Sequence, residues 1–287
     1  APAPAPAPAG LPADVAGRYL RRLGIPAGAA AAGPSAAGLF ALQRAHLERV
    51  PYENLDIQLG RPPAIDPELS ARRFAAGRGG YCFHLNGAFA ALLETLGYDV
   101  TRHVGGVCHD AGDREVNGNH LVLTVRVEGT AYFVDTGLGD GPYEPLPLRE
   151  GPYEQGGFGY RMERLPGDEP GWTFVNEGGP CPVVNFRSAP ATTADFAAEH
   201  ARLSTACDST FVRTLAVLRR DASGIDVLRG RTLSRIEAAA GTSMRELATE
   251  EEFFEVLTTV FGRSPDDLTP ADRTLLWDRA GACPDRS

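Results

Sequence analysis

Hydrophobic positions between about residues 11 and 96 recur at the spacing of an α-helix, which predicts a mostly helical region. One helix is expected around residues 39–50, ending where Pro51 breaks the pattern. A second is expected in GYCFHLNGAFAALLETLG, residues 80–97, with Gly97 at its end. Its apolar stripe consists of Leu85, Phe89, Leu92, Leu93 and Leu96. Cys82 therefore falls in or near the first turn of this helix.

The pattern changes at about residue 100 to short β-prone runs separated by turns that contain glycine and proline. VTRHVGGV, HLVLTVRV and AYFVDT predict a small antiparallel sheet or barrel that extends to about residue 187. The last hundred residues mix strands in FVRTLAVLRR, IDVLRG and TLSRI with an amphipathic helix around EEEFFEVLTTVFG. The predicted class is α+β, with no internal repeat that would indicate a solenoid.

Four regions are expected from these patterns. They are an extended Ala-Pro arm over 1–10, a helical bundle over 11–97, a β-region over 98–195 and a mixed region over 196–287. The arm lacks the basic and uninterrupted apolar parts of a signal peptide, and no run reaches the roughly 18 apolar residues of a membrane span. We therefore expect no membrane partner.

Composition narrows the function classes further. The chain has 287 residues, 43% of them hydrophobic, and a net charge of −9, which is the opposite of the basic surface that binds nucleic acid. The five cysteines are widely spaced and include no C-x-x-C pair. We therefore expect reduced thiols and a cytoplasmic location.

Cys82 is the candidate nucleophile. Unpaired N–H groups and the partial positive charge at a helix start stabilise a thiolate, and they could also hold an oxyanion. Gly79 and Gly80 precede it and are expected to allow a sharp entry with room for a substrate. The general base must come from another segment, and His120 at the head of HLVLTVRV is the best candidate.

Sheet geometry supplies a partner for His120. If residues 128–129 form a two-residue turn, Val127 pairs with Thr130. Continuing that register places Asp135 diagonally across from His120 on the same face. A loop with an odd residue count would separate them unless a bulge restored the register. Asp135 would fix the imidazole tautomer and stabilise its charged form.

Structural roles are the alternative for these residue types. A lone cysteine is usually buried core, and this reading applies to Cys108, Cys181, Cys207 and Cys283. A zinc site is a minor alternative for Cys82, His84, Cys108 and His109, although the usual ligand spacings are missing. Hydrogen-bonded or solvated structural roles are expected for His46, His103 and His200. The glycines Gly105, Gly106, Gly137 and Gly139 would suit either a pyrophosphate or ordinary turns and bulges.

Four stretches together resemble the arylamine N-acetyltransferases, a family that includes related biosynthetic amide synthases. They are HLERVPYENLDI (46–57), RGGYCFHLNGAF (78–89), NHLVLTV (119–125) and YFVDTGLGDG (132–141). The resemblance implies a helical bundle, a β-barrel and an α/β lid, with a cysteine-protease-like core formed by Cys82, His120 and Asp135. It also implies ping-pong transfer in which acetyl-CoA, the donor co-substrate, acylates the cysteine and an arylamine or hydrazine then takes the acyl group, without a metal.

By family position, six residues would line the acyl and acceptor pocket, although core packing explains each about as well. They are Tyr52, Val107, Asn119, Leu138, Gly139 and Phe211. The CoA contacts would involve Gly105, Gly106 and Gly137. The sequence departs from the family pattern at His84, where glutamate is common, and at Asn119, Leu138 and Tyr52. Loss of the usual ring at Leu138 would change the acceptor or admit a bulkier acyl group.

Several functions stay open. The first is an acyl-CoA-dependent N-acyltransferase acting on an arylamine or hydrazine. The second is an amide synthase of the same family that takes a polyketide acyl chain from a carrier protein or closes a macrolactam. A transglutaminase-like cysteine hydrolase would use the same three residues, and a non-catalytic binding module would need no activated thiol.

Overall fold

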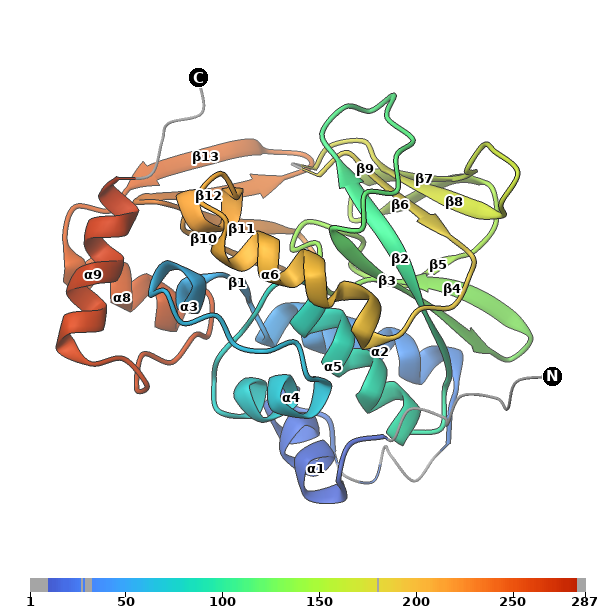
Figure 1. The fold of residues 1–287 in the computed structure, drawn as a ribbon, viewed down its shortest axis with the longest axis horizontal. Helices are drawn as coiled ribbons and strands as arrows, with labels where there is room; N and C mark the ends of the chain where they lie inside the picture. Colours follow the sequence, from blue (N-terminus) through green and yellow to red (C-terminus); the bar gives the residue numbers. More distant parts are fainter. Residues whose placement is uncertain (1–9, 27, 29–32, 180, 283–287) are drawn as a thin grey trace.

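The structure is a computed structural model that describes residues 10–26, 28, 33–179 and 181–282. The predicted arm therefore lies outside the described residues, apart from Gly10. Figure 1 shows a group of helices below two sheets, with the sheet formed mainly by the C-terminal strands backed by α8 and α9. The mixed α+β architecture predicted from the sequence is confirmed, whereas the predicted boundaries between regions stay a prediction.

The helical part surrounds one buried helix. Its members are α1 (Ala13–Arg22), α2 (Ala36–Arg49), α3 (Leu55–Gln58), α4 (Pro67–Ala75) and α5 (Cys82–Thr95). Helix α2 ends at Arg49, before Pro51 as expected, and Gly97 follows α5 with a φ of +87°. Every residue of α5 from Cys82 to Leu93 is buried, so this helix forms the centre of the largest apolar core.

An eight-stranded antiparallel sheet follows in the order β5-β4-β3-β2-β9-β8-β7-β6. Its strands are β2 (Asp99–Cys108), β3 (His120–Val127), β4 (Thr130–Val134), β5 (Leu146–Pro147), β6 (Gly151–Gln155), β7 (Phe158–Arg164), β8 (Gly171–Asn176) and β9 (Val183–Arg187). The edge strands β5 and β6 follow each other directly in the chain, and the sheet curls into a nearly closed barrel around stacked rings of Phe133, Phe174 and Phe186. The predicted sheet or barrel is confirmed.

A second, five-stranded sheet has the order β1-β10-β11-β12-β13. Its strands are β1 (Tyr52–Glu53), β10 (Ala216–Arg220), β11 (Gly224–Arg229), β12 (Thr232–Glu237) and β13 (Gly241–Glu246). The helical elements beside it are η2 (Thr193–Phe196), α6 (Ala197–Thr205), α7 (Thr210–Arg213), α8 (Glu250–Thr259) and α9 (Pro270–Gly281). One face of this sheet packs on α8 and α9 through residues such as Val217, Leu228 and Phe253.

Two details of this part were not predicted. The segment expected to be mostly helical also contributes the short strand β1, because Tyr52 pairs with Leu218 of β10. The strand expected over FVRTLAVLRR begins only at Ala216, since residues 210–213 form α7.

Asn54 explains this break in the strand. Its amide nitrogen donates to the carbonyls of Phe211 (2.9 Å) and Thr214 (2.7 Å), and its oxygen accepts from the Ala216 amide (3.0 Å). One side chain thereby satisfies three backbone groups where the chain leaves α7 and enters β10. The motif PYENL thus connects the helical part with the C-terminal sheet.

Candidate active site

Helix α5 begins at Cys82, with Tyr81 in extended conformation at the N-cap. The Cys82 side chain is 3% exposed. The two preceding glycines make room for the protein itself rather than for a substrate, which corrects our expectation. A Cβ on Gly79 would lie 2.1 Å from the Pro51 carbonyl oxygen, and one on Gly80 would lie 2.7 Å from His84 Cβ.

The hairpin between β3 and β4 has the predicted register. Val127 pairs with Thr130, and the two turn residues, Glu128 and Gly129, have φ of 49° and 77°, as expected of a type I′ turn. His120 Nε2 and Asp135 Oδ2 are 2.6 Å apart, and both side chains are buried. The structure thereby brings together the two residues that sheet geometry had paired.

Cys82 completes this group. Its thiol contacts the His120 imidazole and lies 3.5 Å from the Asn119 carbonyl oxygen. Because Nε2 of His120 faces Asp135, Nδ1 is the nitrogen left to take up a proton from Cys82. The arrangement combines a thiol at a helix start, a proton acceptor and a carboxylate that orients the acceptor.

The electrostatic balance favours a charged His120. Burial disfavours the charged imidazole, but the charge and hydrogen bond of Asp135, together with the Cys82 side chain, outweigh burial and raise the pKa of His120 above its ordinary value of 6.5. An imidazolium beside a cysteine is one of the environments that favour a reactive thiol in proteins.

Asn86, which the sequence analysis missed, holds Asp135 in place. Its Nδ2 donates to Asp135 Oδ1 (3.1 Å) and to the Leu121 carbonyl (2.7 Å), while its Oδ1 accepts from the amide and hydroxyl of Thr136 (2.8 and 2.9 Å). Asn86 lies four residues after Cys82 on α5, so both side chains project from the same face of the helix. This four-residue spacing from Cys82 is the sequence feature that could have identified Asn86.

A cleft of about 760 Å³ opens at Cys82 and His120. Five of the six predicted pocket residues line it, namely Tyr52, Val107, Asn119, Leu138 and Phe211. The carboxamide of Asn119 bonds both backbone groups of Val107 (2.8 and 3.1 Å), so this departure from the family pattern fixes the cleft wall. A large share of the lining comes from β10 to β13, and no sequence motif marks those residues.

The glycines predicted to contact CoA separate into two groups. Gly137 lines the cleft, and a Cβ there would lie 2.8 Å from Cys82 Cα, so only glycine lets this loop approach Cys82 so closely. Gly105 and Gly106 are not part of the lining, and neither is Gly139, the sixth predicted pocket residue. Close neighbours explain the first two, since a Cβ would lie 2.7 Å from the Val122 side chain at Gly105 and 2.7 Å from the Asn117 amide at Gly106. Their contact with CoA stays a prediction.

The structure places His84 in a buried site and corrects the expectation for His46. His84 is buried against Tyr81 and His200, its Nε2 lies 3.3 Å from the Pro63 carbonyl oxygen, and burial lowers its pKa to about 3. It is therefore neutral. His46 is buried among the rings of Tyr19, Phe74 and Phe89, and neither ring nitrogen finds a partner among the described residues, so it is neither hydrogen-bonded nor solvated.

The other cysteines are only partly core residues. Cys108 is buried as expected, but Cys181 is half-buried in the cleft wall and Cys207 is exposed, so the core reading was wrong for these two. Cys283 lies outside the described residues. Within the described ranges, no group of three or more His, Cys, Asp or Glu side chains is arranged to hold a metal ion, which argues against the zinc alternative.

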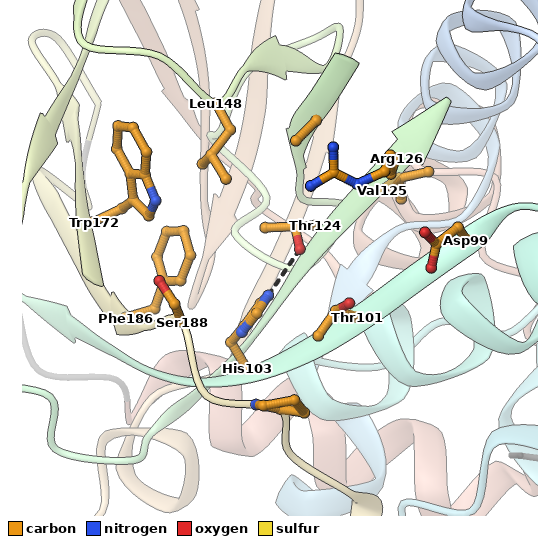
Figure 2. Close-up of a pocket in the computed structure, with 12 residues that line it drawn as sticks. Asp99, Thr101, His103, Thr124, Val125, Arg126, Leu148, Trp172, Phe186 and Ser188 are labelled. Carbon is orange, nitrogen blue, oxygen red and sulfur yellow. Dashed lines mark hydrogen bonds between the residues drawn. The ribbon is translucent and has the colours of Figure 1, made fainter. Parts of the chain in front are cut away.

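A second cavity of about 280 Å³ lies on the barrel and contains none of the predicted site residues. Figure 2 shows His103 pointing to Thr124, with Nε2 2.8 Å from the threonine hydroxyl. The other ring nitrogen lies 3.1 Å from the Ala189 carbonyl. Both nitrogens are thus occupied, as expected of a structural histidine.

A family model described as N-acetyltransferase matches residues 36–264. An arylamine N-acetyltransferase of Mycolicibacterium smegmatis is 32% identical over 89% of this chain and 94% of its own length. The chain belongs to the arylamine N-acetyltransferase family. It is therefore an acyltransferase, and the helical part, barrel and C-terminal sheet implied by the resemblance are confirmed.

Two further matches bear on the substrates. The structure of Mycobacterium marinum arylamine N-acetyltransferase in complex with CoA superposes with a TM-score of 0.81 at 27% identity, over 93% of this chain and 99% of that one. Proansamycin X synthase of Amycolatopsis mediterranei (strain S699) is 30% identical over 56% of this chain and 61% of its own length. Among the described residues of this family member, no helix is long and apolar enough to cross a membrane.

Proposed function

We propose that this protein transfers an acyl group from an acyl-CoA to an arylamine or hydrazine through a thioester on Cys82. The contact of Cys82 with a His120–Asp135 pair at the floor of an open cleft carries the proposal. The 2.6 Å hydrogen bond supports the role of Asp135 in orienting the imidazole.

In the first half-reaction His120 Nδ1 takes the thiol proton and the Cys82 sulfur attacks the thioester carbonyl. The tetrahedral intermediate collapses with cleavage of the donor C–S bond, and the departing CoA sulfur takes the proton from His120. In the second half-reaction the amine nitrogen attacks the acyl carbon, His120 accepts the amine proton, and Cys82 leaves and is protonated again. Backbone N–H groups at the start of α5 would hold the oxyanion in both steps.

Mass measurement of the intact protein tests this proposal. After incubation with acetyl-CoA, a single acetyl adduct is expected on the wild type and on Cys181→Ser, but not on Cys82→Ser. Cys181 is the matched control because it lines the same cleft. An adduct that persists in Cys82→Ser, or a Cys82→Ala protein that keeps its activity, would refute the proposal.

Amide synthesis with a larger acyl group is the second candidate. The residue at 138 favours it, since Leu138 lines the cleft where the family commonly carries an aromatic ring. The similarity to proansamycin X synthase also supports it. Acylation of Cys82 by a carrier-protein thioester, with none by acetyl-CoA, is the result that would favour this candidate.

A further inference from the structure

The C-terminal sheet turns one of its faces towards the cleft. Consecutive strand pairs align Tyr52 with Leu218, Leu218 with Val227, Val227 with Ser234 and Ser234 with Met244. These five residues, here called the cleft row, all line the cleft that contains Cys82. Neighbouring strands are about 4.8 Å apart, so the row extends for about 19 Å from Tyr52 to Met244.

One end of the cleft row lies beside the nucleophile. The loop of residues 137–139 lies between them, because the Cβ position of Gly137 is 2.8 Å from Cys82 Cα and that of Gly139 is 3.0 Å from Leu218 Cβ. The same position on Gly139 is 3.3 Å from Tyr52 Cβ. Cys82 and all five residues of the row line the same cleft, so a group attached to the Cys82 sulfur can reach the row at its first strand.

The cleft row is uncharged, and part of its apolar surface is exposed. Leu218 and Val227 are only half-buried, and Met244 at the outer edge is 72% exposed. Charged side chains of this face lie in the two neighbouring rows. Arg229 and Glu246 lie on either side of Thr232, and Arg220 lies two residues after Leu218 on β10. An exposed methionine that continues an apolar surface from a reactive thiol is typical of a binding surface.

We infer that the cleft row binds an extended acyl chain attached to Cys82, so that thioesters of medium-length and long acyl chains are preferred donors. This inference rests on the proposed thioester chemistry and adds the class of donor. Each methylene that is fully buried contributes about 0.8 kcal/mol, which corresponds to roughly fourfold in rate when the contact forms in the transition state. Leu138 at the start of the row leaves space for such a chain, whereas a ring there would narrow the entry.

Straight-chain acyl thioesters of N-acetylcysteamine, from acetyl to dodecanoyl, test the inference without the contacts of CoA. For the wild type, kcat/KM of Cys82 acylation is expected to rise by up to about fourfold per methylene. Val227→Trp should lose the gain from a shorter chain length onward than Ser234→Trp, since Val227 lies one strand nearer to Cys82. Leu138→Phe should weaken acylation by all but the shortest chains.

Ser243→Trp is the matched control, because Ser243 is exposed on the opposite face of β13 and should keep the wild-type profile. If Val227→Trp fails to fold, the comparison of Ser234→Trp with Ser243→Trp still tests the inference. A wild-type rate that is the same for all chains, or equal effects of Ser234→Trp and Ser243→Trp, would overturn the inference while leaving the acetyl chemistry in place. Failure of every thioester to acylate Cys82 would instead overturn the proposed function.

Discussion

At the scale of single residues, the site depends on how burial and neighbouring charges set protonation. Burial alone would lower the pKa of His120 and keep the imidazole neutral, but the charge and hydrogen bond of Asp135 raise this pKa above its ordinary value. His84 shows the opposite case, since burial without a charged partner in direct contact lowers its pKa to about 3. Two histidines near one cysteine are therefore expected to have opposite charge states at neutral pH.

We predict that Asp135→Asn lowers acyl transfer by roughly 10⁴-fold, as in other triads that lose this carboxylate. Loss of the charge should also lower the pKa of His120, so the imidazolium would no longer stabilise the Cys82 thiolate. Alkylation by iodoacetamide would then begin at a higher pH than in the wild type, as the rate measured against pH would show. Asp140→Asn, a buried carboxyl of the same loop, is the control; an unchanged alkylation profile in Asp135→Asn would contradict the prediction.

Asp140 offers a separate pH test. Burial raises its pKa from 3.8 to about 7, although the hydrogen bond from the Cys181 amide acts in the other direction. Because the folded protein holds this proton more tightly than the unfolded chain, the contribution to stability is complete below about pH 4 and is lost as the pH rises through about 7. Asp140→Asn should therefore gain stability relative to the wild type over this window, by roughly 4 kcal/mol at most. Denaturant unfolding at several pH values measures the difference; a constant difference would contradict the assignment.

At the scale of elements, contacts between segments far apart in the chain hold the site. Asn86 links α5 to the loop after β4, and Asn54 links the segment before α3 to α7 and β10. Both are short amides that satisfy several buried groups at once, and each unsatisfied group costs about 1–3 kcal/mol.

Asn86→Ala should reduce kcat by roughly 10- to 100-fold with little change in KM, because Asp135 would lose a donor that positions it. The onset of Cys82 alkylation should also move to higher pH, a change that a general loss of stability would not produce. A normal kcat together with reduced stability would show that Asn86 is only structural.

Asn54→Ala should act on substrate binding instead. The Thr214 carbonyl and the Ala216 amide would lose Asn54 as a partner, while the Phe211 carbonyl would keep only its bond from Gln58. The wall that carries Phe211 would loosen, so KM for the acceptor should rise more than kcat falls. Steady-state kinetics with a fixed donor separate the two effects. An equal loss in kcat would contradict this role.

The sequence predicts the elements that local patterns specify, but not those that depend on contacts between distant residues. Periodicity located α5 and the β3–β4 hairpin because a strong apolar stripe and a Glu-Gly turn specify them locally. The two-residue strand β1 and helix α7 depend on Asn54, whose three partners lie more than 150 residues away. Asn86 was missed for the same reason, since its partner Asp135 is 49 residues away. The cleft row depends on the pairing of five strands, which local patterns do not specify.

At the scale of the whole molecule, the three parts have separate chemical tasks. The helical part supplies Cys82 on a helix buried almost throughout, the barrel supplies His120 and Asp135, and the C-terminal sheet supplies a wall of the cleft. Family membership establishes the acyltransferase class. The shape of the cleft carries the inference about the acyl chain.

The proposed mechanism requires the acyl group to rest on Cys82 between donor and acceptor. Its most direct test is a single-turnover experiment in which protein treated with acetyl-CoA is freed of CoA and then mixed with an arylamine. We expect one acetyl group per protein to appear as the N-acetyl amide, together with loss of the adduct from the Cys82 peptide. Product that forms only while acetyl-CoA and amine are present together, with no adduct on Cys82, would contradict the account.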